Sequence, residues 1–373
     1  MVLCISAEGN RMKRNFTIAM VVLVLLGAQA AWAQKPSVIT RLDGAAYVVR
    51  ACATHDWIAT WSALSNGTYD LYVVNGENGT KQRVTNERVP GGICWIPNTT
   101  RLLYCKGVYN SKVDFTRVTY YTYDVQTESS RKLIDVNDML DTFILDPIAA
   151  ENGDTAFHMT IAGTPKGELP SFNVYITEAQ FMSTTPAEAN IASDFDLSSD
   201  GTKVYWLLHD PDTGNLFIVG WNIAQQKYSD FYEFGTSADP ADDHALLKIQ
   251  STSDRAATLA ASETDPTLKL CTYNFADVNN MYIQPLHLKA EEEIISFDWL
   301  GRGDVVYALL QDTASGESLV EEINVITGAR NRLLTTLDPI SYLDYSAGSK
   351  TYYYSVVDER SGGEAETALI RLK

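Results

Sequence analysis

Short apolar runs alternate with polar turn residues throughout residues 194–231. The polar cluster at residues 198–201 separates the first two runs, and residues 211–214 separate the second from the third. Apolar runs of this length, with Gly, Asp and Asn at the turns, indicate antiparallel strands joined by hairpins. The stretch is therefore predicted to form a four-stranded antiparallel meander.

The same pattern recurs along the chain, with starts near residues 46, 92, 143, 193, 246, 294 and 340. A repeat of about 45 to 54 residues is the length expected for a four-stranded propeller blade. The sequence thus predicts an all-β fold, a seven-bladed β-propeller of four-stranded antiparallel blades. The last repeat offers only three strands, so we expect an N-terminal strand at residues 37–42 to pair with residues 367–372. That pairing would close the ring and remove an open sheet edge.

The first 33 residues have the pattern of a signal peptide. The basic residues Lys13 and Arg14 precede the apolar run 16–26, and Ala31-Trp32-Ala33 fits a signal-peptidase site; the same features also fit a start at Met12. The alternative is a transmembrane anchor, for which the apolar run is short of the ~20 residues that a bilayer requires. We expect cleavage after Ala33, a periplasmic or secreted location, and one propeller domain at residues 34–373.

The chain is acidic. It carries 29 basic and 47 acidic side chains, for a net charge of −18. Removal of residues 1–33 takes away Arg11, Lys13, Arg14 and Glu8, which leaves 29 − 3 = 26 basic against 47 − 1 = 46 acidic side chains and a charge of −20. This balance argues against nucleic acid or an anionic membrane surface as a partner and favours a basic protein or cations. The alternative is that the charge only maintains solubility.

Two cysteines could form a disulfide. Cys94 and Cys105 flank a predicted turn at residues 97–101, and pairing symmetric about that turn would place them opposite each other. Export permits a disulfide. Two buried thiols are the alternative, because only some ladder positions meet the distance requirement.

Two repeats resemble a known family. Asp70-Leu71-Tyr72-Val73, Asn78-Gly79 and Val84-Thr85 follow the second half of the TolB-like propeller repeat, also called the PD40 or WD40-like repeat, and Leu197–Gly201 follows its first half. The resemblance implies a non-catalytic periplasmic protein that binds another envelope protein or an envelope polymer. We expect such a protein to be a monomer, to need no cofactor and to have no stable membrane insertion after signal cleavage.

Aspartates recur at one position of the repeat. They directly precede the residue aligned with the family Trp, and are Asp146, Asp196, Asp298 and Asp344; the other repeats have Arg50, Cys94 and Gln250 there. Four carboxylates beside a central channel could attract a cation such as calcium, which prefers oxygen ligands. Alternatively, each Asp accepts main-chain hydrogen bonds from the next blade.

Long connections on one face of the predicted ring also carry acids, namely Asp239, Asp242, Asp243, Glu291, Glu292 and Glu293. Long loops that share a face are where repeat proteins usually bind partners, so we expect the partner here. The alternative is that these are solvated loops that tolerate change.

A catalytic alternative rests on two histidines. His158 and His209 are expected to end the second strands of adjacent blades, as in propeller lyases that hold a metal with histidines. The sequence has no Gly-x-Ser-x-Gly elbow, His-Glu-x-x-His pair or phosphate-binding loop. A non-catalytic binding protein is therefore the favoured prediction, with a metal-dependent lyase or hydrolase using His158, His209 and loop carboxylates as the alternative.

Overall fold

First strands of the repeats begin close to the predicted starts. In the computed structural model they begin at residues 45, 93, 142, 191, 247, 292 and 340. The structure describes residues 35–110, 115–139, 142–144, 148–149, 155–162, 171–176, 180–184, 191–198, 200–209, 215–236, 247–250, 255–262, 265–274, 288–301, 303–359 and 365–373. The predicted signal peptide lies outside these residues. Residues Ser37–Lys373 form one compact unit.

In the described residues the strands form seven antiparallel sheets, which we number along the chain. Sheet one contains β2 (Ala45–Ala51), β3 (Trp57–Ala63), β4 (Tyr69–Asn75) and β5 (Lys81–Glu87). Sheet two contains β6 (Ile93–Trp95), β7 (Arg101–Asn110), β8 (Phe115–Asp124) and β9 (Ser129–Met139). Sheet three contains β10 (Thr142–Ile144), β11 (Ile148–Ala149), β12 (Thr155–Ala162), β13 (Ser171–Ile176) and β14 (Gln180–Thr184).

Sheet four contains β15 (Ile191–Leu197), β16 (Lys203–His209), β17 (Asn215–Asn222) and β18 (Lys227–Thr236). Sheet five contains β19 (Leu247–Ile249), β20 (Arg255–Ser262) and β21 (Asp265–Asn274). Sheet six contains β22 (Glu292–Trp299), β23 (Val305–Asp312), β24 (Ser318–Asn324) and β25 (Arg330–Thr336). Sheet seven contains β26 (Ile340–Ser346), β27 (Thr351–Glu359), β28 (Ala365–Leu372) and β1 (Ser37–Asp43).

The strand number varies among the sheets. Only five of the described sheets have four strands; sheet three has five, because β10 and β11 both pair with β12, and sheet five has three. The prediction of seven four-stranded blades is therefore wrong. Pro147, which has no N–H to donate to a ladder, stands in the sequence between the two short strands of sheet three. The strand expected at residues 281–286 lies outside the described residues.

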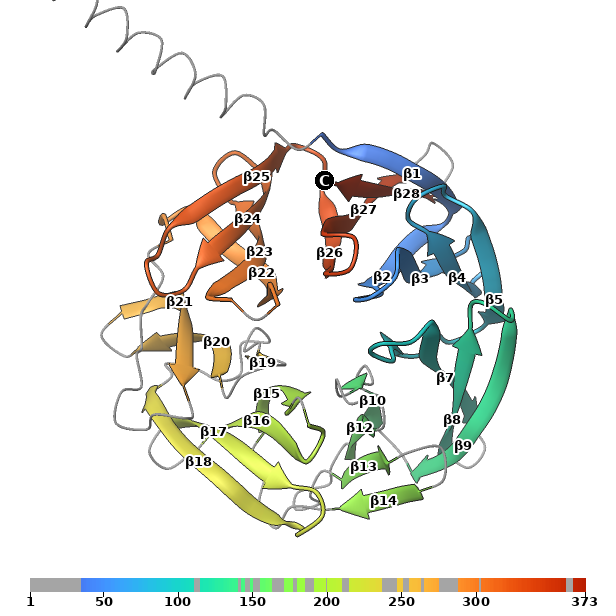
Figure 1. Ribbon diagram of the computed structural model, residues 1–373, viewed down its shortest axis with the longest axis horizontal. Helices are drawn as coiled ribbons and strands as arrows, with labels where there is room; N and C mark the ends of the chain where they lie inside the picture. Colours follow the sequence, from blue (N-terminus) through green and yellow to red (C-terminus); the bar gives the residue numbers. More distant parts are fainter. Residues whose placement is uncertain are drawn as a thin grey trace, which may run out of the picture. The chain divides into compact units, whose positions relative to one another are not determined.

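Sheet seven joins the two ends of the described chain. β1 pairs antiparallel with β28, with Ser37 opposite Arg371 and Asp43 opposite Glu366. Figure 1 shows β1 in blue along the outer side of β28. The predicted pairing of an N-terminal strand with the C-terminal strand is confirmed.

Neighbouring sheets pack face to face. Inner strands of successive sheets contact one another in the order β26, β2, β6, β11, β15, β19 and β22. Of these, β26, β2, β15 and β19 are labelled near the centre of Figure 1. The core fills the spaces between sheets: Trp61 and Leu71 of sheet one, for example, pack with Ile93 and Tyr104 of sheet two. Sheets six, seven and one thus bury both faces, which a single meander cannot do alone.

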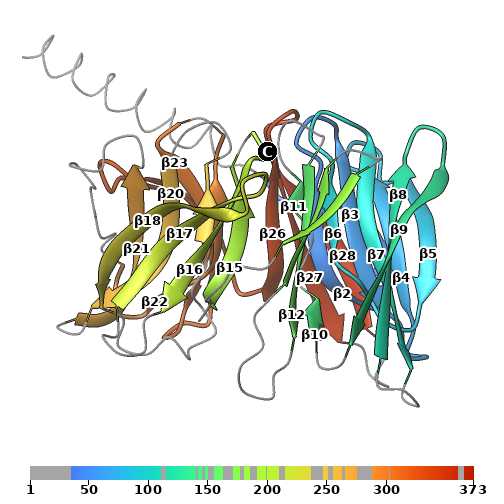
Figure 2. The same ribbon diagram turned by 90° about the horizontal axis from the view of Figure 1, so that it is seen from below.

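Turns and connections separate onto two faces of this unit (Figure 2). We call the end with the turns between first and second strands the hairpin face. The opposite end has the turns between second and third strands and the connections between sheets; we call it the connection face. Across the part of the chain that the structure describes, no helix has the length and hydropathy needed to cross a membrane.

Candidate binding site

The first strand of each sheet has one residue aligned with Asp196 and Asp344, and we call its place the central position. Asp196 and Asp344 make the same kind of contact with the next sheet. Asp344 of β26 accepts a hydrogen bond from the main-chain N–H of Ala51 at 2.8 Å, and Asp196 of β15 accepts one from Ile249 at 2.8 Å. In both bonds the donor is the residue directly after the central position of the next sheet. Arg50 and Lys248 are the central residues of sheets one and five.

Tryptophans confirm this alignment. Trp95 donates its indole N–H to the oxygen of Arg50 at 2.9 Å, and Trp299 donates to the oxygen of Lys248 at 3.1 Å. The sequence alignment that placed Gln250 at the central position is therefore wrong by two residues. Gln250 is buried instead, and its amide donates to the oxygens of Gly301 and Gly303 at 3.0 and 2.7 Å.

Corrected in this way, the central position carries cations as well as carboxylates. Arg50 occupies this position in sheet one, which comes after the sheet of Asp344. Lys248 occupies it in sheet five, which comes after the sheet of Asp196. Of the other central residues, Cys94 lies in sheet two and Asp298 in sheet six, while Asp146 lies outside the described residues. The carboxylates that were expected to attract a cation thus have cations of this chain as neighbours.

Burial and charge set the acidity of these carboxyls. Burial raises the pKa of Asp196 to about 6, with a further rise from the charge of Asp298 and an opposing effect of Lys248. Burial also raises the pKa of Asp344, and the Arg50 cation opposes that rise. Asp344 in addition accepts a hydrogen bond from the Tyr307 hydroxyl of sheet six at 2.9 Å. Asp196 and Asp344 therefore join adjacent sheets, as the alternative interpretation expected.

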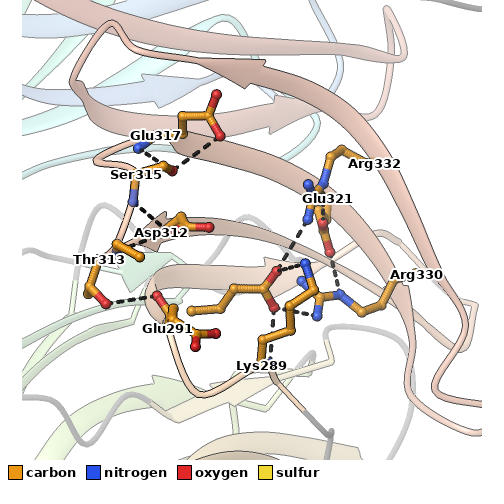
Figure 3. Close-up of polar contacts among 11 residues, drawn as sticks. Lys289, Glu291, Asp312, Thr313, Ser315, Glu317, Glu321, Arg330 and Arg332 are labelled. Carbon is orange, nitrogen blue, oxygen red and sulfur yellow. Dashed lines mark hydrogen bonds and ion pairs between the residues drawn. The ribbon is translucent and has the colours of Figure 1, made fainter.

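Glu292 differs from its two neighbours in sequence. Its side chain is fully buried and forms ion pairs with Arg330 at 2.6 Å and Arg332 at 3.3 Å. Both arginines are labelled in Figure 3. Glu321 is buried beside it and holds the same two arginines at 2.5 and 2.7 Å. Burial alone would raise the pKa of Glu292, but the hydrogen bonds from Arg330 and Lys289 and the Arg330 charge lower it to about 2.

Glu291, Glu292 and Glu293 were expected together in a long connection, but β22 already begins at Glu292, whose side chain is buried. Period-two alternation in β22 turns Glu292 and Ile294 inward and leaves Glu293 and Ile295 exposed, and Glu291 is exposed before the strand begins. Asp239, Asp242 and Asp243 lie outside the described residues.

A β-bulge recurs three residues before the central position. It leaves Tyr47 of β2, Ile295 of β22 and Ser341 of β26 out of the ladders, ahead of Arg50, Asp298 and Asp344. A bulge redirects a side chain and often lies beside a functional site. Ile295 and Ser341 are exposed, at the connection-face end of their strands. Sequence reasoning missed these bulges, although the adjacent apolar pair Ile294-Ile295 breaks the alternation of β22 and could have signalled one.

Cys94 and Cys105 are not joined by a disulfide. Cys94 lies opposite Leu103, so the symmetric register that would have brought the two cysteines together is wrong by two residues. Both side chains are buried, and the Cys105 thiol lies 3.7 Å from the oxygen of Gly92. The alternative of two buried thiols describes the structure.

The two histidines occupy different levels of their strands. His209 ends β16 as expected, whereas His158 lies inside β12, opposite Asn173. Among the residues that the structure describes, no three His, Cys, Asp or Glu side chains form a group able to hold a metal ion.

Comparisons with known proteins bear on the fold. No protein-family model matches the chain, and no curated protein matches it by sequence. The propeller domain of the Trilobed protease from Pyrococcus furiosus, described as having an open velcro topology, has a TM-score of 0.59 at 11% identity, over 84% of this chain and 91% of that one. The fold is a β-propeller.

Two further structures are similar to this propeller. The acylaminoacyl peptidase of Pyrococcus horikoshii has a TM-score of 0.58 at 11% identity; the match covers 87% of this chain and 51% of the peptidase. Hydrazine synthase from Kuenenia stuttgartiensis has a TM-score of 0.54 at 11% identity, over 83% of this chain and 92% of that one. At 11% identity these similarities show the shared architecture alone.

Proposed function

We propose that this propeller is an exported, non-catalytic binding protein whose partner docks on the connection face, beside the starts of β22, β26 and β2. The function is that implied by the TolB-like resemblance, and the partner is an envelope or secreted protein. The predicted signal peptide is the basis for export to the periplasm or the exterior.

The recurring bulge is the observation that carries the proposal. It occurs in sheets six, seven and one, which are consecutive neighbours in the propeller: Tyr307 bonds to Asp344 across the first boundary, and β26 contacts β2 across the second. The register of sheet four also shifts, between Ile191 and Phe195, so the irregularity belongs to several first strands; sheets six, seven and one present it side by side. Ile295 and Ser341 are exposed there on a rigid scaffold, which suits a docking surface.

A photo-crosslinking amino acid at Ser341 tests the proposal directly. Lys350, exposed in the β26–β27 turn at the opposite end of the same hairpin, provides the matched control. With the full-length protein expressed in its own envelope, position 341 should give a discrete crosslinked protein on illumination, and position 350 should not. Crosslinks only at position 350, or none at either position, would contradict docking on the connection face.

A further inference from the structure

The connection-face end of sheet six presents exposed aliphatic side chains beside exposed acids. Glu293, Gln311, Ser318 and Thr336 form one cross-strand row through all four strands of that sheet. Glu293, on β22, is the inner end of this row. Ile295 lies two residues after Glu293 on the same strand and is 46% exposed. Leu337 follows its outer end and is 73% exposed, the largest value among the exposed large hydrophobic residues of the described chain.

Three acidic side chains at this end are exposed to solvent. Glu291, Glu293 and Asp338 are exposed there, next to the two aliphatic residues. The described cations nearby are Lys289, Arg330 and Arg332, and all three form ion pairs with the buried Glu292; the two arginines also pair with the buried Glu321. These ion pairs hold the three cations against buried carboxylates, although the side chains of Lys289 and Arg332 are 65% and 41% exposed; the three exposed acids outnumber these two partly exposed cations.

We propose that this rim, defined as Glu291, Glu293, Ile295, Leu337 and Asp338, binds an extended, basic segment of a partner protein that inserts aliphatic side chains beside Ile295 and Leu337. This proposal rests on the proposed function and specifies the partner's chemistry. Exposed aliphatic residues supply the contact, and the surrounding acids select Lys or Arg and speed association.

The geometry also sets the length of the segment. The row crosses three interstrand spacings of about 4.8 Å, a span of about 14 Å. An extended peptide rises about 3.3 Å per residue, so about four to five residues bridge the rim. Aliphatic residues about four apart, with basic residues between them, match this spacing.

A labelled peptide with the repeated sequence Lys-Leu provides the probe, with Lys-Ser and Glu-Leu peptides of equal length as controls. Fluorescence anisotropy with the whole mature protein should show binding of the Lys-Leu peptide, and weaker or no binding of the other two. The double variant Ile295→Ser with Leu337→Ser should weaken binding about tenfold or more, because burial of aliphatic side chains supplies the contact. Glu291→Gln with Glu293→Gln should weaken binding about threefold and flatten its salt dependence.

Ile326→Ser is the matched control variant. Ile326 is 49% exposed in the β24–β25 turn, at the hairpin-face end of the same sheet, and its substitution should leave the affinity unchanged. Equal binding of the Lys-Ser peptide would mean general attraction to an acidic protein and would overturn the proposal. So would equal losses from Ile326→Ser and from the rim double variant. If position 341 crosslinks a partner while the Lys-Leu peptide does not bind, this inference fails and the proposed function stands.

Discussion

Trp299 donates its indole N–H to the main-chain oxygen of Lys248, 3.1 Å away on the first strand of the preceding sheet. Trp95 makes the equivalent bond to Arg50. The sheet before each cation carries an aspartate that bonds to the residue after that cation. Asp196 accepts the N–H of Ile249, after Lys248, and Asp344 accepts the N–H of Ala51, after Arg50. The order aspartate, cation, tryptophan therefore occurs twice, in sheets four to six and in sheets seven, one and two.

Trp299→Phe should destabilise the propeller by about 1 to 2 kcal/mol, because the phenyl ring retains apolar contact but leaves the oxygen of Lys248 without its donor. Trp61→Phe is the matched control: the Trp61 indole N–H is buried and has no hydrogen-bond partner among the described residues, so no bond to them is lost. Denaturant unfolding of the two variants measures the difference. An equal or larger loss in Trp61→Phe would show that ring volume, and not the hydrogen bond, determines the effect.

Glu292→Gln should cost about 3 kcal/mol, since it leaves Arg330 and Arg332 against Glu321 alone in a mostly buried network. Glu293→Gln, on the adjacent exposed residue, should change stability by less than about 0.5 kcal/mol. Because the folded-state pKa of Glu292 is lowered to about 2, its stabilising contribution is complete above the unfolded value of about 4.3 and is lost as pH falls toward 2. Urea unfolding at pH 7 and at pH 3 should therefore show a smaller difference between Glu292→Gln and the parent at the lower pH.

The sequence predicted periodic features well. Turn residues and alternation located the first strands within a few residues, and the unmatched strand at residues 37–42 correctly indicated closure by β1. The register of strand pairing was harder to predict, because it depends on the type and length of each turn, which the sequence did not give. A shift of one residue would exchange the two faces of a strand, whereas a shift of two residues would not. The errors at Gln250 and at Cys94 with Cys105 are both shifts of two residues, which preserve the face and so leave the apolar pattern unchanged.

The candidate site was less predictable for a related reason. A count of acids cannot tell Glu292 from Glu293, since their difference arises only when β22 forms and when Arg330 and Arg332 reach across from β25. The bulges at Ile295 and Ser341 depend on pairing with a second strand, which alternation in one strand does not reveal. Charge composition predicted an acidic surface, and the fold determines which acids remain on it.

Closure by β1 can be tested at a single side chain. Leu42 is 1% exposed and packs with Val49, Ile58 and Leu369 between sheets seven and one. Leu42→Ala should therefore cost about 3 kcal/mol and lower the melting temperature by several degrees. Val38→Ala, on the same strand but 50% exposed, should change stability little. Similar melting temperatures for the two variants would mean that β1 adds little to the stability of the ring.

Asp196 should make part of the propeller's stability depend on pH near neutrality. Its folded-state pKa, raised by burial to about 6, exceeds the unfolded value of about 3.9, so the folded protein holds a proton more tightly than the unfolded chain between these values. The sign follows from linkage: stability is greatest below pH 4, falls as pH rises through 6, and is then constant, with a total change on the order of 3 kcal/mol. Asp196→Asn removes the titration, and so its unfolding free energy should fall less than that of the parent between pH 4.5 and pH 7. Lys248→Met removes the cation that opposes the rise, so the decline should extend to higher pH. If the parent and Asp196→Asn lose the same stability over this interval, the carboxyl titrates normally and the link to Ile249 is maintained by an ionised aspartate throughout.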